Sequence, residues 1–283
     1  MRRLLILLLV CCLPFTGWAQ LRSDSLHSVL SPACHSSHAF SAKQVILPTT
    51  LIAVGTTGFL DPVKEWDLKV YRSLSTISQS QRLTFDNYIQ YVPAVSAVGL
   101  GWIGADAQHV TIDRLLLTGT SYTIMSAVVQ IIKHSIPSTR PFTYEMYYER
   151  GNPWGYTVKN HPSSFNSFPS GHSATAFLGA ELVRLEYGKD NPWLAVGAYT
   201  IAAGTGFLRI YNEKHWVTDV IAGAGIGIAS ARIGWWLLPF EQRVMTNLFG
   251  ESFLRPTGKP KKEVTVCPLT DGHSAELAFS ISF

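Results

Sequence analysis

Three short segments of this sequence combine cations, histidines, a carboxylate and a Ser-Gly turn. They run from Lys133 to Pro141, from Pro169 to His172 and from Arg209 to Asp219. Lysine and arginine side chains neutralise phosphate oxygens, and the planar guanidinium fork of arginine suits them in shape. We therefore assign phosphate binding to the three cations of these segments: Lys133, Arg140, Arg209.

The second and third segments add groups that could break a phosphate ester. Ser170 and Gly171 open an apolar helical run, so their backbone N–H groups can face an anion at a helix N-terminus. His215 and Asp219 are four residues apart, a spacing that on a helix places them on one face. The carboxylate can then hold one ring nitrogen and leave the other free to attack phosphorus. His172 is left to protonate the leaving oxygen.

These residues resemble the three signature motifs of the type 2 phosphatidic acid phosphatase superfamily, which also contains bacterial acid phosphatases and vanadium haloperoxidases. The family pattern is Lys-x6-Arg-Pro, then Pro-Ser-Gly-His, then Ser-Arg-x5-His-x3-Asp. All three occur here in the right order and spacing, over roughly residues 90 to 238. One position departs from the pattern, because Leu208 stands where the family has serine.

The resemblance implies a role for each matching residue. His215 is the nucleophile that forms a phosphohistidine, Asp219 orients it, and His172 is the general acid that later activates water. The phosphate oxygens are bound by five residues: Lys133, Arg140, Ser170, Gly171, Arg209. The phosphatase branch needs no metal or other cofactor, whereas the haloperoxidase branch holds vanadate in the same pocket.

Composition narrows the class of protein. The 283 residues carry a net charge of +4, and only 15% are charged, against about 25% in soluble domains. The mean hydropathy is +0.15. No basic cluster with interleaved aromatic residues appears, so we predict no nucleic-acid partner. The expected partners are a phosphorylated lipid and the membrane, and no protein partner is predicted.

The N-terminus has the pattern of a secretory signal. Two arginines precede an apolar run, and a small-residue cleavage site follows, which predicts a signal peptide over residues 1–19. The alternative is an uncleaved membrane anchor. Residues 20–44 are predicted to form an N-terminal tail. Cleavage would leave Cys34 and Cys267, which could pair in an oxidising compartment or both stay free.

Residues 45–238 are predicted to form the phosphatase domain, an all-α bundle of about six long helices. The region from 63 to 89 is charged and amphipathic, which favours a helix along a surface. We expect the bundle to be membrane-embedded, although soluble relatives pack similar helices. Runs 112–132 and 217–238 are long enough to cross a bilayer, whereas run 45–60 is marginal. The six apolar runs are 45–60, 91–105, 112–132, 173–187, 194–208 and 217–238.

All three motifs fall at one end of this bundle. Six true spans after a cleaved signal would place that end in the cytoplasm, whereas exported relatives usually work in the periplasm. We predict an integral protein of the bacterial envelope with a periplasmic site, which requires the 45–60 run not to cross.

Two regions outside the helical runs have their own sequence patterns. Residues 239–283 form a C-terminal tail, in which alternating residues around Thr270-Asp-Gly272 indicate a small β-hairpin. The aromatic stretch 142–168 joins two motifs. It is either a substrate rim or a loop that packs for its own stability.

The sequence therefore predicts a phosphatase that hydrolyses a phosphomonoester or pyrophosphate of a membrane lipid. Candidate substrates are lipid A, undecaprenyl pyrophosphate, phosphatidylglycerol phosphate and phosphatidic acid. A nonspecific acid phosphatase of the periplasm is the alternative, and a vanadium haloperoxidase is a more remote one.

Overall fold

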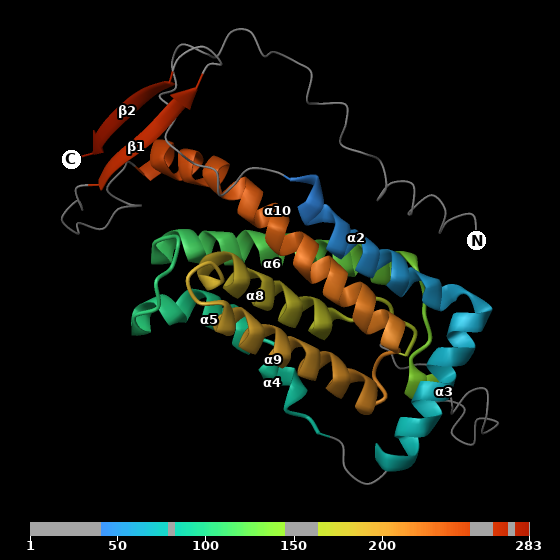
Figure 1. Ribbon diagram of the computed structural model, residues 1–283. Helices are drawn as coiled ribbons and strands as arrows, with labels where there is room; N and C mark the ends of the chain where they lie inside the picture. Colours follow the sequence, from blue (N-terminus) through green and yellow to red (C-terminus); the bar gives the residue numbers. More distant parts are fainter. Residues whose placement is uncertain (1–40, 79–82, 145–163, 250–262, 271–274, 283) are drawn as a thin grey trace. The chain divides into compact units, whose positions relative to one another are not determined.

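A computed structural model describes residues 41–78, 83–144, 164–249, 263–270 and 275–282, and these are coloured in Figure 1. The strands β1 (Glu263–Thr270) and β2 (Ala275–Ser282) pair with each other in a two-stranded sheet that belongs to a separate unit. The helical unit contains α2 (Ala42–Thr56), η1 (Thr57–Phe59), α3 (Asp61–Ser78), α4 (Asp86–Ile89), α5 (Val92–Gly99), η2 (Leu100–Ile103), α6 (Thr111–Ser135), α7 (Pro141–Tyr144), α8 (Gly171–Tyr187), α9 (Pro192–Tyr211) and α10 (Val217–Phe249).

Helix α8 forms the core of the helical unit. It packs against α5, α6, α9 and α10, and most of its side chains are buried, including Leu178 and Leu182 at 0% exposure. A helix that is apolar on every side is stable only when other helices surround it. The first turn of α8 is therefore held in a fixed place at one end of the bundle.

Helix α10 lies between α8 and α2, which run beside it in Figure 1. Small residues allow this close packing. A methyl group added at Gly227 would lie 2.2 Å from the carbonyl oxygen of Ala174 in α8, and one at Gly225 would lie 2.8 Å from that of Pro48 in α2. The Ala-Gly run of α10 therefore brings its neighbours within backbone contact on two sides.

A buried ionic network also joins three helices of the bundle. Glu181 of α8 is fully buried and pairs with Arg232 of α10 at 2.5 Å and with Arg184 of its own helix at 2.7 Å. The hydroxyl of Tyr199 in α9 donates to the same carboxylate at 2.5 Å. Two cations and a hydroxyl thus satisfy a carboxylate that would otherwise be costly to bury.

The predicted bundle is correct in kind, but three of its helices differ from expectation. Run 91–105 does not form one long helix, because α5 gives way to η2 and Gly104 ends it at a φ of +95°. Region 63–89 forms two helices, α3 and α4. Helix α10 continues beyond residue 238 as far as Phe249, with Pro239 inside it.

Two helices, α6 and α10, are long and apolar enough to cross a membrane, among the residues that the structure describes. These correspond to the two runs predicted to be long enough. Helices α2 and α3 would make a third span if they act together, and they are bent by 89° at their junction. The predicted signal peptide, Cys34, most of the N-terminal tail and the centre of the 142–168 stretch lie outside the described residues, as does the side chain of Cys267.

Candidate active site

The three motifs meet at one end of the helical unit. Lys133 lies in the last turn of α6, Ser170 is the N-cap of α8, and Arg209 lies in the last turn of α9. Asp219 lies in the first turn of α10. The backbone N–H of Ser170 donates to the carbonyl of Asp219 at 3.0 Å, which joins the second motif directly to the third.

Backbone hydrogen bonds join the first motif to the residues just before the second. Ser138 N–H donates to the carbonyl of Phe165 at 2.8 Å, and Ser167 N–H donates to the carbonyl of Ser138 at 3.0 Å. Arg140 N–H donates to the carbonyl of Ser164 at 3.0 Å. These bonds fix the chain at Ser138 and Arg140 against the segment that leads into α8.

His215 and Asp219 are close, but they do not share a helix as their spacing suggested. Helix α10 begins at Val217, so His215 precedes it. Asp219 reaches back toward the turn, and its Oδ2 lies 3.5 Å from His215 Nδ1. That distance is an ion-pair separation, longer than the usual limit of about 3.2 Å for an N–H···O bond. Both residues are 2% exposed.

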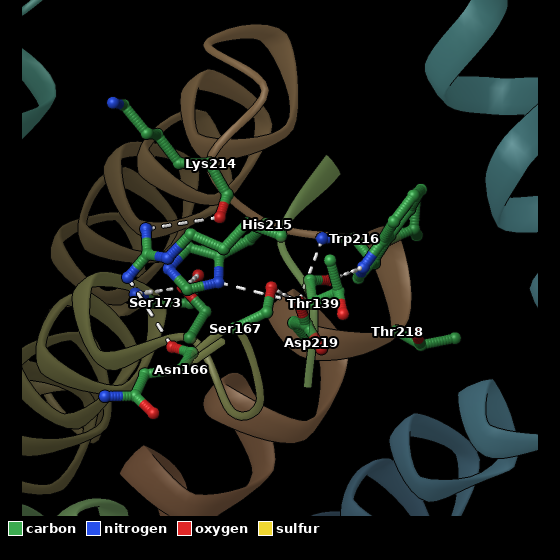
Figure 2. Close-up of polar contacts among 12 residues, drawn as sticks. Thr139, Asn166, Ser167, Ser173, Lys214, His215, Trp216, Thr218 and Asp219 are labelled. Atoms are coloured by element: carbon green, nitrogen blue, oxygen red, sulfur yellow. Dashed lines mark hydrogen bonds and ion pairs between the residues drawn. The ribbon is translucent and has the colours of Figure 1, made fainter. Parts of the chain in front are cut away.

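Two hydrogen bonds hold the Asp219 carboxylate, as Figure 2 shows. The Ser167 hydroxyl donates to Oδ2 at 2.5 Å, and the backbone N–H of Trp216 donates to the same oxygen at 3.0 Å. The second bond is half of a capping box, in which the third residue of a helix bonds back to the residue that precedes the helix. Ser167 is fully buried and was not among the predicted site residues.

Two of the three predicted phosphate-binding cations, Lys133 and Arg140, donate hydrogen bonds to backbone carbonyl groups. Lys133 Nζ donates to the carbonyl of Asn166 at 2.7 Å. Arg140 donates to the carbonyl of Lys214 at 3.3 Å and, more weakly, to that of Asn166 at 3.5 Å (Figure 2). A neutral carbonyl orients a cation but leaves its charge uncompensated, so both side chains can still attract an anion.

The third cation is paired with a carboxylate that the sequence analysis did not identify. Arg209 Nη1 lies 2.7 Å from Oδ2 of Asp86 in α4, and both side chains are buried. The Nε atoms of Arg209 and Arg140 are buried and have no hydrogen-bond partner. Buried donors without partners are unusual, and two on arginines at one site indicate a place for an anion.

The cations also determine the electrostatics of the two histidines. Burial, followed by the charges of Arg140, Lys133 and Arg209, lowers the pKa of His215 well below its ordinary value. Burial and then Arg209 lower the pKa of His172 to about 4. Both imidazoles are therefore neutral at pH 7 in the free protein, which leaves a lone pair on His215 for nucleophilic attack.

Helix α3 fixes the start of α10, and with it the position of Asp219. The carboxylate of Asp67 accepts the backbone N–H of Val217 at 3.1 Å and the hydroxyl of Thr218 at 2.5 Å. Trp216 is held by its indole N–H, which donates to the carbonyl of Thr139 at 2.8 Å. Asp67 therefore acts as an N-cap supplied by another helix.

The site presents buried N–H donors and positive charges to an anion. Within the described ranges, no group of three or more His, Cys, Asp or Glu side chains is arranged to hold a metal. The structure thus brings together all eight residues selected from the sequence and adds four others around them: Asp67, Asp86, Asn87, Ser167. No spacing signal marks these four, because their contacts within the site, including that of Asn87 with His172, join residues 52 to 151 positions apart in the chain.

Comparison with known proteins identifies similar sequences. The chain is 33% identical over 153 residues to the lipid A 1-phosphatase of Porphyromonas gingivalis, a match that covers 54% of this chain and 30% of that protein. It is 36% identical over 74 residues to the bacitracin transport permease protein BcrC of Bacillus licheniformis, over 26% of this chain and 34% of that protein. The chain therefore spans about a third of the length of these relatives.

Two solved structures are similar to this one. The transmembrane PAP2 type phosphatidylglycerolphosphate phosphatase from Bacillus subtilis is 21% identical, with a TM-score of 0.48 over 74% of this chain and 100% of that chain. LpxE from Aquifex aeolicus is 20% identical, with a TM-score of 0.39 over 58% of this chain and 92% of that chain.

A family model matches the helices that carry the motifs. Residues 114–243 match the model described as PAP2 superfamily, and this range includes all eight residues selected from the sequence. Residues 114–243, in which the three motifs are complete and lie at one site, are therefore similar to the PAP2 superfamily.

Proposed function

We propose that this protein is a membrane-bound phosphatase that hydrolyses a phosphomonoester or pyrophosphate of a lipid through a phosphohistidine on His215. One observation carries the proposal. Three cations converge on a buried, neutral imidazole, and two of them have buried N–H groups without partners. A phosphate bound there would satisfy these donors and place phosphorus within reach of His215.

The mechanism follows from the positions of the side chains. A bound phosphate dianion raises the pKa of His172 and so favours its protonated form. His215 attacks phosphorus with its free ring nitrogen, and the bond to the leaving oxygen breaks as the protonated His172 gives its proton to that oxygen. Asp219 stabilises the positive charge that develops on His215. His172, now neutral, then takes a proton from water as the water attacks the phosphohistidine. Phosphate leaves, and both histidines return to their starting states.

A lipid substrate is favoured over a small soluble ester. Helices α6 and α10 are each long and apolar enough to cross a bilayer, and both carry residues of the site. A substrate could keep its acyl chains in the membrane while its phosphate reaches the end of the bundle. The relative with the longer match is named for lipid A 1-phosphate, so we propose lipid A as the first substrate to test.

The test is phosphate release by the detergent-purified protein and its His215→Ala variant, with EDTA present. The panel contains lipid A, undecaprenyl pyrophosphate, phosphatidylglycerol phosphate, phosphatidic acid and p-nitrophenyl phosphate. We expect release from at least one lipid and none by the variant. His134→Ala is the matched control, because its exposed ring bonds only within α6, to the carbonyl of Gln130, and it should keep wild-type activity.

The other outcomes identify the alternatives. Turnover of p-nitrophenyl phosphate alone would indicate a nonspecific acid phosphatase. Vanadate-dependent halide oxidation without phosphatase activity would indicate a haloperoxidase. Full activity in His215→Ala would rule out the phosphohistidine mechanism.

We further propose that the site faces the periplasm, as the signal-like N-terminus suggests. Helix α2 has 15 residues, about 22 Å, which is short of the roughly 30 Å hydrocarbon core. Tyr88 is 79% exposed and lies next to Asn87 at the active site. A cysteine introduced by Tyr88→Cys, in a variant whose four natural cysteines are replaced by serine, can therefore report on which side of the membrane the active site lies. A membrane-impermeant thiol reagent should label it in intact spheroplasts. Labelling only after lysis would place the site in the cytoplasm, with α2 crossing.

A further inference from the structure

The segment from Leu83 to Ile89 lies against the active site although it is outside the family match. Three side-chain contacts connect it to residues of the second and third motifs. The amide of Asn212 accepts the backbone N–H of Leu83 at 3.1 Å and donates to its carbonyl at 2.6 Å. Asp86 pairs with Arg209 at 2.7 Å, and Asn87 Oδ1 lies 3.1 Å from Nε2 of His172.

These contacts hold Asn87 in a fixed position. Asp86 is 1% exposed and Arg209 is 6% exposed, so water competes little for their ion pair. The carbonyl of Asn87 also accepts a hydrogen bond from the side chain of Gln90 at 2.8 Å. The amide of Asn87 is therefore supplied by a short helix that the Asp86–Arg209 pair and the Leu83–Asn212 bonds hold in place, although Asn87 itself is exposed.

The contact between Asn87 and His172 has a definite chemical consequence. An amide oxygen only accepts hydrogen bonds, so Nε2 of His172 must carry its hydrogen when it bonds to Oδ1. The bond persists in the imidazolium form and is stronger there, because the donor is then charged. It sets the tautomer of the neutral ring and favours the protonated ring, the form that a general acid requires.

We propose that Asn87 is a positioning residue that orients the general acid His172 and favours its protonated form, with α4 held in place by the Asp86–Arg209 pair. This inference rests on the proposed phosphatase function. The imidazolium needs such support because its surroundings are mainly cationic. The charged or titratable groups near it are Arg209 from α9, Lys133 from α6, Arg140 and His215 from the connecting segments, and Asp86 from α4.

The sign of the expected pH effect follows from this environment. Burial and the neighbouring cations lower the pKa of His172 to about 4 in the free protein, and a bound phosphate dianion should raise it. Because the acid must be protonated, kcat falls as pH rises through the pKa of His172 in the substrate complex. Loss of the Asn87 oxygen should move this falling limb to lower pH, and a carboxylate in its place should move it to higher pH.

The experiment measures pH profiles of kcat for wild type, Asn87→Ala and Asn87→Asp. The substrates are an alkyl phosphate and p-nitrophenyl phosphate in detergent. We expect a downward shift of the limb of about half to one pH unit for Asn87→Ala and an upward shift for Asn87→Asp. The alanine variant should lose more activity on the alkyl phosphate, whose poor leaving group depends more on the acid. Thr84→Ala, at an exposed position of the same segment, is the matched control.

Opposite shifts in the two variants would not result from a general loss of structure. Equal losses of kcat at every pH and for both substrates would overturn the positioning role and leave the phosphatase function intact. Limbs that move in the same direction in both variants would overturn it as well. A wild-type protein that releases no phosphate would instead refute the proposed function, and the inference with it.

Discussion

The hydroxyl of Ser167 is expected to matter for catalysis although it contacts no substrate. It donates to Asp219 Oδ2 at 2.5 Å, and both residues are buried, at 0% and 2% exposure. The same oxygen lies 3.5 Å from His215 Nδ1. Removal of the hydroxyl by Ser167→Ala therefore frees the carboxylate to rotate away from the imidazole that it should orient.

The size of the effect can be estimated from the bond. A hydrogen bond to a charged group contributes about 1.5–3 kcal/mol. Each 1.36 kcal/mol of barrier corresponds to about a tenfold change in rate. If the whole contribution is felt in the transition state, Ser167→Ala should reduce kcat roughly 10- to 150-fold. The Trp216 N–H still holds Asp219 in the variant, so activity should not be abolished.

The assay is the initial rate of phosphate release at saturating substrate, with size-exclusion profiles to verify folding. Ser230→Ala is the matched control, because Ser230 is also buried in the bundle at 2% exposure. It lies eleven residues beyond Asp219 along α10, about 16 Å away. The control should remain within about twofold of wild type, since it removes a buried hydroxyl far from the site.

The Ser167→Ala, Asp219→Ala double mutant tests whether the effect of Ser167→Ala on kcat acts through Asp219. In an Asp219→Ala background, Ser167→Ala should cost less than about twofold, because the hydroxyl has already lost its acceptor. The reasoning would be refuted by a single Ser167→Ala variant with wild-type kcat. A full additional loss in the Asp219→Ala background would also refute it.

Two further predictions concern stability and pH. Asp67→Ala should lower the melting temperature by roughly 2–8 °C, because it removes the cap on the start of α10, worth about 1–2 kcal/mol. Glu65→Ala, an exposed carboxylate change on the same helix, should shift it by less than about 2 °C, and an equal shift would contradict the capping role. The rising limb of kcat/KM, which reports the free enzyme, should lie below pH 6.5, because burial and neighbouring cations lower the pKa of His215, which must be unprotonated to attack. Arg140→Gln removes one of these cations, so the limb should move to higher pH; a downward shift would contradict this reading.

The eight residues that the structure brings together could be selected from the sequence because they occur in three compact motifs. Short spacings restrict how far apart side chains can lie, and long apolar runs indicated which helices would carry them. Helices α6 and α10, which are long and apolar enough to cross a membrane, were predicted from the two longest apolar runs. Local pattern was less reliable at helix ends. His215 precedes α10 rather than lying on it, since Trp216 and Asp219 form the cap at that point.

Only the tertiary structure revealed what holds the motifs in place. Ser167 reaches Asp219, Asp67 caps α10, Asp86 pairs with Arg209 and Asn87 bonds to His172. Each contact joins segments far apart in the chain, and a single Asp, Asn or Ser looks the same in the sequence whether it faces solvent or a catalytic group. The packing of α3, α4 and α8 against α9 and α10 decides this difference, because only close packing brings such a side chain to a buried partner. The sequence by itself determined which groups can perform the chemistry, and the packing of the helices determined which other residues orient them.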